Sequence, residues 1–414
     1  MLNLKNKITK GISVILALFM LASCTAPSGG GAATQTPQAN STQTEAPAAN
    51  NSIDINLSEN ADQKISLQDL GMSEYAATQG VGLIGLDGNP TVSPLDLFLT
   101  SAEVETLRAG NFKVGINFHY TGNDWAALQE SALRNAFEFL GIEVVALADS
   151  ENTPEKQVSD LETMMAMKPD AIVSAITDPA MVENTFDKIA QAGIKIVFME
   201  NVPNNYTDAK KDNFVAMVTC DSYGNGVAAA EIMAEKLGEE GEIGFLYWER
   251  RTPSQVSRQQ GFEDTIAKYP NIKVVATEGF EKVDSTGTLT DALLVKQPDL
   301  DALFAPWDIP AEYAAASAIS AGRNDLIITT VDLGQNCGRI IAEDGPIKGT
   351  GAALPYDQGI AEAVCVAYTL LGKELPGQYV AVPTFGVNRE NLLEAYELVF
   401  HTGAPEEYKN LLGN

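Results

Sequence analysis

The chain has 414 residues, 45% of them hydrophobic, and carries a formal net charge of −28 at pH 7. This length and apolar content are sufficient for the cores of two ordinary domains. Such a negative charge repels the nucleic-acid backbone and anionic lipid headgroups, so we exclude nucleic-acid binding.

The N-terminus has the pattern of an export signal. Three lysines precede a short apolar run from Ile12 to Leu21. The run is too short to span a bilayer as a mature helix, so it predicts a signal peptide over residues 1–23. The following Cys24 completes a stretch that resembles the lipobox of bacterial lipoproteins. That resemblance implies acylation of Cys24 with fatty acid such as palmitate and anchoring to the outer side of the cell membrane. The alternative is an ordinary signal peptide in which Cys24 has no role.

Two further segments precede the main body of the chain. Residues 24–75 contain long runs of Ala, Thr, Ser, Pro, Gln and Asn, which favour a flexible tether because little apolar surface is available to repay ordering. We expect residues 76–111 to form an extra segment packed on the first lobe. Within it, Thr100 and Glu103 predict a capping box, and Gly110 predicts the end of that helix.

From residue 113 onward, short apolar runs alternate with stretches of helical length. The run KVGINF, for example, is followed by an amphipathic stretch that ends at Gly141, and the alternation continues to the run LIITTVD. Apolar strands between helices indicate parallel sheets covered on both faces. About ten strands suggest two sheets of roughly five. We therefore predict an α/β protein with two doubly wound lobes and a crossing near Asp221.

Polar and aromatic residues follow the predicted strands, where open parallel sheets bind ligands. The pair Trp307 and Asp308 stands at such a strand end, immediately before a helix. Asp308 could act only as a helix cap, but an indole at the rim of a sheet is better explained by stacking on a flat apolar face. Carboxylates, amides and aromatic faces together are typical of sugar and polyol recognition. No metal or cofactor is required.

Other functions have weaker support in the sequence. His119 and His401 are the only histidines, so few catalytic triads are possible, although Glu200 and Asp308 could form a glycosidase pair. A glycine pattern beginning at Gly224 imitates a dinucleotide fingerprint but lacks the expected acidic residue about twenty positions on. Beyond Cys24, three scattered cysteines show no zinc spacing; they could be free or include one disulfide.

From about residue 113 to about residue 387 the chain resembles the sugar-binding class of type I periplasmic binding proteins. The supporting stretches, in order, are KVGINFHYTGNDWAALQESALRNAFEFLGIEVV, NTPEKQVSDLETMMAMKPDAIV, AGIKIVFMENV, VTCDSYGNGVAAAEIM, SRQQGF, LDALFAPWDIPAEYAAASAISAG and VDLG. No helix-turn-helix segment precedes them, which separates the chain from the repressors that share this fold. The resemblance implies a receptor for an ABC importer rather than an enzyme.

The resemblance also implies a set of ligand-binding residues. They are His119, Asn123, Trp125, Glu200, Asn201, Arg258, Trp307, Asp308, Asp332 and Tyr356. Ribose-binding members of this class have an arginine at the position of Asn201 and an asparagine at the position of Trp307. These differences argue against ribose itself and in favour of another sugar or polyol.

The same resemblance implies the division of the body and its mode of action. Lobe 1 would comprise residues 112–220 and 354–382, and lobe 2 residues 221–353 and 383–414, joined by three crossings that act as a hinge. We expect a monomer that closes on its ligand and is then recognised by an ABC permease. The alternatives are a nucleoside or signalling-furanone receptor, a sugar sensor coupled to a kinase, and a secreted glycosidase.

Overall fold

The computed structural model describes residues 60–79, 81–206 and 212–413, together with residues 53, 55 and 57. They belong to a compact unit that spans Glu45–Asn414. The expected signal peptide and Cys24 lie outside the described residues. No helix within the described residues is long and apolar enough to cross a membrane.

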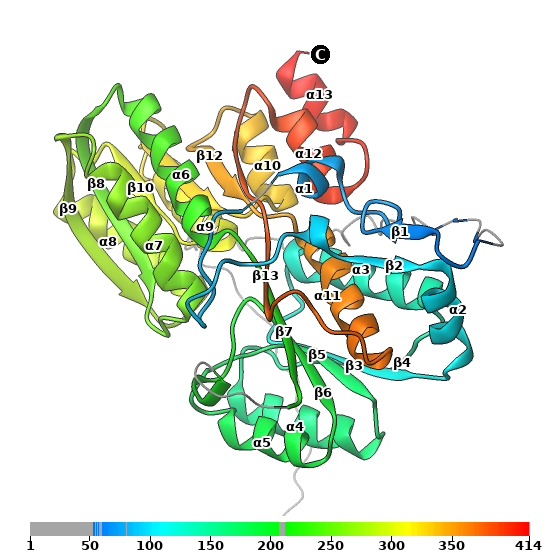
Figure 1. The fold of residues 1–414 in the computed structure, drawn as a ribbon. Helices are drawn as coiled ribbons and strands as arrows, with labels where there is room; N and C mark the ends of the chain where they lie inside the picture. Colours follow the sequence, from blue (N-terminus) through cyan, green and yellow to red (C-terminus); the bar gives the residue numbers. More distant parts are fainter. Residues whose placement is uncertain are drawn as a thin grey trace, which may run out of the picture. The chain divides into compact units, whose positions relative to one another are not determined.

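The first sheet is entirely parallel and, within the described residues, has six strands (Figure 1). In spatial order they are β13 (Tyr379–Val382), β7 (Phe214–Cys220), β6 (Lys195–Met199), β5 (Ala171–Ala175), β3 (Lys113–Phe118) and β4 (Glu143–Asp149). Helices α3 (Asp124–Leu140) and α11 (Pro355–Leu370) cover one face, and α4 (Pro154–Ala166) and α5 (Glu183–Gln191) the other. We call this sheet with its helices lobe 1.

The second sheet also has six strands within the described residues. In spatial order they are β14 (Phe385–Asn388), β12 (Ile347–Ala352), β11 (Ile327–Val331), β10 (Ala302–Phe304), β8 (Glu240–Trp248) and β9 (Asn271–Phe280), and only β14 pairs antiparallel among them. Its helices are α6 (Ser222–Leu237), α7 (Pro253–Ile266), α8 (Thr286–Lys296), α9 (Asp308–Ser320) and α10 (Gln335–Ala342). This sheet and its helices form lobe 2, which the C-terminal helices α12 (Leu392–Phe400) and α13 (Glu406–Leu412) follow in the chain.

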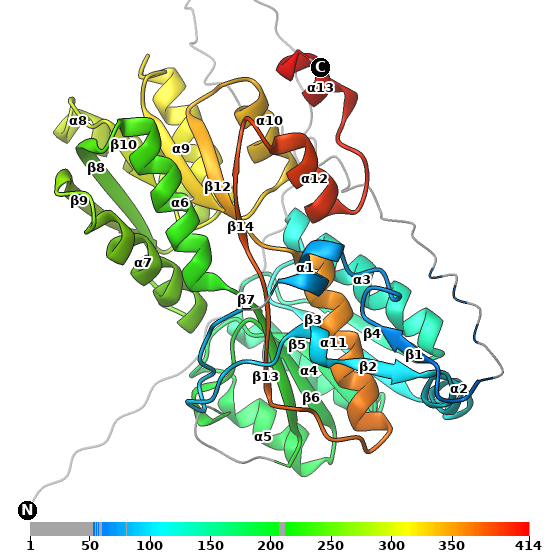
Figure 2. The same ribbon diagram turned by 45° about the horizontal axis from the view of Figure 1, so that its top comes forward.

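The two-lobed α/β prediction is confirmed, and three segments of the described chain cross between the sheets (Figure 2). The first follows β7 at Asp221, whose carboxylate caps α6 by accepting from the Gly224 amide at 2.7 Å. The second joins β12 to α11, and the third joins β13 to β14. The carboxyl ends of the two sheets are therefore connected directly by the chain at the hinge.

One glycine of the pattern that imitates a dinucleotide fingerprint, Gly226, has a packing role. A Cβ on Gly226 of α6 would overlap the carbonyl oxygen of Arg258 in α7, and a Cβ on Gly261 of α7 would overlap the carbonyl oxygen of Tyr223 in α6. Each helix thus needs a glycine where its neighbour's backbone approaches. These glycines are explained by the contact between α6 and α7.

The chain before residue 111 contains more structure than the sequence predicts. Strand β1 (Lys64–Ser66) pairs antiparallel with β2 (Phe98–Thr100), and helix α1 (Glu74–Thr78) lies between them in the chain. The sequence predicts a flexible tether over residues 24–75, yet four side chains within this range are buried, namely Ile65, Leu67, Leu70 and Met72. Apolar residues spaced among polar ones were enough to anchor this stretch.

Part of this N-terminal region contacts the hinge. Ser73 donates from its amide and hydroxyl to the buried Asp357 carboxylate, at 2.8 and 2.6 Å, beside the second crossing. The Tyr75 hydroxyl donates to the carbonyl of Thr384 in the third crossing at 3.2 Å, and Val92 pairs with Val380 at the edge of β13. We call residues 73–92 the strap. The next helix, α2 (Ser101–Ala109), has the predicted capping box and ends at Gly110.

The three described cysteines, Cys220, Cys337 and Cys365, are buried free thiols. This decides the question that the sequence left open between free thiols and a disulfide within this part of the chain.

Candidate functional site

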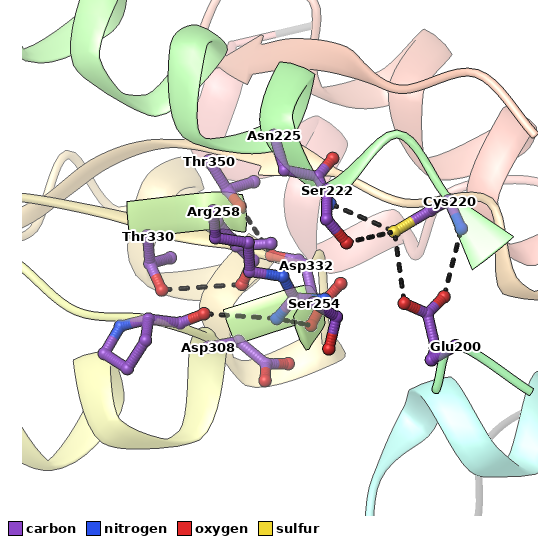
Figure 3. A network of polar contacts seen from close by, with 12 residues as sticks. Glu200, Cys220, Ser222, Asn225, Ser254, Arg258, Asp308, Thr330, Asp332 and Thr350 are labelled. Atoms are coloured by element: carbon purple, nitrogen blue, oxygen red, sulfur yellow. Dashed lines mark hydrogen bonds and ion pairs between the residues drawn. The ribbon is translucent and has the colours of Figure 1, made fainter. Parts of the chain in front are cut away.

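The carboxyl ends of both sheets bring most of the predicted ligand-binding residues to one region. His119 follows β3, Glu200 and Asn201 follow β6, Trp307 and Asp308 follow β10, and Asp332 follows β11. Figure 3 shows the polar part of this region, where Glu200 approaches from lobe 1 and Arg258, Asp308 and Asp332 belong to lobe 2. Parallel strands deliver these side chains because their carboxyl ends share one edge of each sheet.

Arg258 is the central cation of the site. It projects from α7, with its side chain 7% exposed, and its Nη1 lies 3.5 Å from Oδ2 of Asp332 and donates to the Pro306 carbonyl at 3.2 Å. Its Nε and the Oδ1 of Asp332 are buried and have no hydrogen-bond partner among the described residues. Burial raises the pKa of the Asp332 carboxyl, and the Arg258 charge opposes that shift. The pair therefore keeps one buried donor and one buried acceptor without a hydrogen-bond partner among the described residues.

Asp308 does not cap its helix in the ordinary way. Trp307 occupies the N-cap position without a side-chain cap, and Asp308 is the first helical residue. Among the described residues, its Oδ1 accepts from the neighbouring Ile309 amide alone, at 2.9 Å. Burial, and then the charges of Glu312, Asp332 and Asp124, raise the pKa of the Asp308 carboxyl well above its usual range. A capping role alone does not account for this carboxylate.

Glu200 and Asn201 have well-defined partners at the end of β6. Glu200 accepts from the Cys220 amide at 3.1 Å and from the Thr219 hydroxyl at 3.2 Å, and burial raises the pKa of its carboxyl. Asn201 exchanges two hydrogen bonds with Ser254 of lobe 2, accepting from its amide at 3.0 Å and donating to its hydroxyl at 3.1 Å. Asn201 thus joins the two lobes.

Two aromatic groups flank the polar residues. In lobe 2 the Trp307 ring packs against Trp248, with centroids 5.6 Å apart, and against Phe280 at 5.4 Å. In lobe 1 the rings of Trp125 and His119 are 5.7 Å apart. Burial lowers the pKa of His119 to about 4, with Asp149 opposing and Arg250 adding to the shift, so its imidazole is neutral at pH 7.

Two predicted residues have other surroundings. Asn123 caps α3, its Oδ1 accepting from the Ala126 amide at 2.9 Å, so its oxygen is already used. Tyr356 is fully buried in α11, where its hydroxyl accepts from Asn135 at 3.1 Å and its ring packs on His401. The structure does not bring Tyr356 together with the other predicted residues.

Three groups at the site were not predicted from the sequence. Asp124 of lobe 1 accepts from the backbone amide of Gln335 in lobe 2 at 2.7 Å and from its side chain at 3.2 Å. Arg250 donates across to the Asn152 carbonyl at 2.9 Å. Glu312 lies one turn after Asp308 on α9. Helical spacing from Asp308 could have identified Glu312, whereas contacts between lobes leave no periodic signal in a sequence.

The arrangement suits hydrogen bonding more than catalysis or metal binding. Within the described residues, no group of three or more His, Cys, Asp or Glu side chains could hold a metal ion. The free Arg258 donor, the free Asp332 acceptor and the Trp307 ring supply the contacts that a small polar molecule with an apolar face requires.

Comparison of the sequence with known protein families gives a match over more than half of the chain. Residues 114–374 match the family described as periplasmic binding protein domain. The ribose import binding protein of Escherichia coli is 25% identical over 256 residues, a match that covers 62% of this chain and 83% of that relative. The D-apiose import binding protein of Actinobacillus succinogenes is 26% identical over 229 residues, covering 53% of this chain and 70% of that relative.

Solved structures show the same fold. An ABC transporter solute binding protein from Agrobacterium vitis with bound α-D-tagatopyranose aligns with a TM-score of 0.64 and 21% identity, covering 71% of this chain and all of that chain. Another from the same organism, with bound allitol, aligns with a TM-score of 0.61 and 23% identity, covering 69% of this chain and 98% of that chain. The family match begins after the strap, which therefore lies outside it.

Proposed function

The chain belongs to the periplasmic binding protein family, and from this premise we propose that it captures a sugar or polyol between its lobes and delivers it to an ABC importer. The observation that carries the proposal is the Arg258–Asp332 pair, which is buried and yet leaves a donor and an acceptor without partners. A vicinal diol can satisfy both, because a hydroxyl donates and accepts at once. The relatives compared above are import binding proteins for ribose and for D-apiose.

The proposed ligand-binding residues lie at the carboxyl ends of the strands and at helix starts of both lobes, except Arg258, which projects from within α7. They are His119, Asn123, Trp125, Glu200, Asn201, Arg258, Trp307, Asp308 and Asp332. We leave Tyr356 out because its hydroxyl and ring are occupied inside lobe 1. Hydrogen bonds to charged groups contribute about 1.5–3 kcal/mol each. Four of them, less the cost of immobilising the ligand, can reach the roughly −8 kcal/mol of a micromolar site.

The proposal also concerns the two lobes, the attachment of the protein to the membrane and its recognition by the permease. The boundaries expected from the sequence, 112–220 with 354–382 and 221–353 with 383–414, place one binding surface on each lobe. A lipid on Cys24 would hold the monomeric receptor at the outer side of the cell membrane, and the closed, loaded form would be the one the permease accepts. A ligand stabilises this form only through its higher affinity for it.

The test is a thermal-shift screen of the purified full chain against pentoses, hexoses, polyols and nucleosides. A ligand that binds only the folded state at a hundred times its dissociation constant adds about 2.7 kcal/mol of stability, which is easily measured. A shift with one sugar or polyol supports the proposal and names the ligand. Shifts confined to nucleosides, or turnover of a chromogenic glycoside, would contradict it.

Trp307→Ala supplies the site-directed arm of the same experiment. Loss of the indole face should weaken binding by more than tenfold, while circular dichroism shows the protein still folded. Ile319→Ala is a matched control, because Ile319 lies on the same helix with 52% of its surface exposed. An affinity unchanged by Trp307→Ala would remove Trp307 from the site.

A further inference from the structure

One end of the proposed site carries three carboxylates from the two lobes. Asp308 and Glu312 lie one turn apart on α9, and Asp124 begins α3 in lobe 1. A Cβ on Gly334 would overlap Oδ2 of Asp308 and would lie 3.2 Å from Oδ2 of Asp124. Oxygens of two carboxylates thus flank the same glycine, at the start of α10. We call Asp124, Asp308 and Glu312 the acidic end of the site.

The protein itself offers the acidic end little positive charge. Asp124 accepts from two donors of Gln335, Asp308 from the Ile309 amide, and Glu312 from the Asn336 amide at 3.4 Å, and all these donors are neutral. The α10 N-terminus contributes roughly half a positive charge.

The nearby arginines have other partners. Arg258 pairs with Asp332 at 3.5 Å, and Arg339 pairs with Glu343 at 3.0 Å, although its charge still lowers the pKa of Glu312 slightly. Burial first, and then the charges of neighbouring carboxylates, raise the pKa values of Asp308 and Glu312. Within the described residues, none of the three carboxylates of the acidic end forms an ion pair with an arginine or lysine.

We propose that the ligand is an amine-bearing sugar or polyol, whose protonated amine lies between Asp124 and Asp308. This inference rests on the proposed function and narrows its substrate class. An ammonium group donates three hydrogen bonds, which fits carboxylate oxygens that approach from both lobes. Because it touches both lobes, the same group also stabilises their closure.

A separate observation requires the rest of the ligand to carry oxygen atoms. The Nε–H group of Arg258 is buried without a partner among the described residues, and its side chain is 7% exposed. This donor needs an acceptor, which a hydroxyl or ring oxygen supplies and an ammonium does not. Figure 3 draws Arg258 and Asp308 in one polar network, and Arg258 donates to the carbonyl of Pro306, two residues before Asp308. One small molecule can therefore present an oxygen to the arginine and an amine to the acidic end. The neighbouring Trp307 ring can receive either a sugar face or a cation.

The experiment compares matched ligands on the full chain by isothermal titration calorimetry at pH 7.5. Each set holds a neutral sugar, its 2-amino-2-deoxy analogue and the N-acetylated analogue, beginning with glucose, glucosamine and N-acetylglucosamine and repeating with the galactose and mannose series. We expect the amine of at least one set to bind at least tenfold more tightly than both neutral members. Acetylation keeps the nitrogen but removes the charge, so it separates charge from hydrogen bonding.

Asp308→Asn tests whether the preference arises at the acidic end. The variant should lose more affinity for the amine than for its neutral analogues, so that the advantage of the amine over the neutral sugar falls at least fivefold even if both bind more weakly. Asp344→Asn is the control, because this exposed aspartate pairs with Lys348 away from the site. Tighter or equal binding of neutral sugars in every set would overturn the inference and leave the proposed function standing. Absence of binding by all members would overturn the inference and also count against the proposed function.

Discussion

Arg250 provides the clearest test of how the two lobes are held together around a ligand. It follows β8 in lobe 2, and its guanidinium donates to the carbonyl of Asn152 in lobe 1 at 2.9 Å and lies 3.5 Å from the carbonyl of Thr177. Its other contact, over the ring of Trp248 at 5.2 Å, stays within lobe 2. Arg250→Ala therefore removes a hydrogen bond that exists only when the lobes are together.

The expected size of the effect follows mainly from the shorter of the two hydrogen bonds to lobe 1, the one to Asn152. Such bonds contribute about 1.5–3 kcal/mol, and partial solvent exposure of Arg250 favours the lower end. We expect the closed form to lose about 1.5 kcal/mol, which weakens the apparent affinity for the ligand roughly tenfold when the ligand-free protein is mainly open. Titration calorimetry with the ligand found in the screen measures the affinity, and small-angle scattering measures the closure.

The neighbouring arginine is a matched control. Arg251 donates to Gln259 and lies over the ring of Tyr247, both within lobe 2. Arg251→Ala removes the same charge from the same loop and should leave affinity within about twofold, since it breaks no contact between lobes. If both variants bind equally well, or if both lose affinity equally, the contact with Asn152 does not stabilise closure and the reasoning is refuted.

Three further predictions concern the folded protein without ligand. Burial raises the pKa of Glu312 from 4.5 to about 7; because the folded state then binds the proton more tightly, stability against urea should fall as the pH rises from about 4.5 to about 7, and Glu312→Gln should flatten that fall. Ser73→Ala should lower the free energy of unfolding by about 1–3 kcal/mol, since it deprives a buried carboxylate of a donor, and an unchanged urea midpoint would show that the strap adds no stability. Gly226→Ala should lower the thermal midpoint because its Cβ overlaps the α7 backbone, whereas Gly287→Ala, whose Cβ meets its nearest neighbour at 3.4 Å, should not.

The sequence predicts the two-lobed fold because its signals are local and repeated. Apolar runs between amphipathic stretches identify the buried parallel strands, and a single glycine in the left-handed conformation ends α3 at Gly141 as expected. The sequence does not reveal β13 and β14. Each is four residues long, and its position in the sheet depends on pairing with β7 or β12, respectively. For the same reason β1 lies in a stretch predicted to be a tether. A short strand forms because it pairs with a strand that is distant in the sequence. The residue pattern of the short segment alone does not identify that partner.

The residues of the candidate site also fall into those that the sequence identifies and those that it does not. Residues at strand ends, such as Glu200 and Asp332, can be found from the sequence because each follows a recognisable apolar run. Tyr356 was placed by resemblance alone, near a hinge, and its burial among α3 and α12 could not be foreseen from the spacing. The bonds made by Arg250 and Asp124 join loops from opposite lobes, so they depend on the approach of the lobes rather than on any local pattern.

Backbone geometry is unusual at two of these strand ends. Glu200 and Asp332 both adopt left-handed backbone, with φ of +61° and +68°, a conformation that costs a non-glycine residue roughly 1–2 kcal/mol. Each directly follows the third strand of its sheet, β6 in lobe 1 and β11 in lobe 2, counted from the hinge edge. Glycine would remove the strain at both positions, yet both hold carboxylates. The strained backbone is understandable if it directs each carboxylate to a place where a ligand needs it. Equivalent positions in the two lobes would then each supply one carboxylate to a ligand held between them.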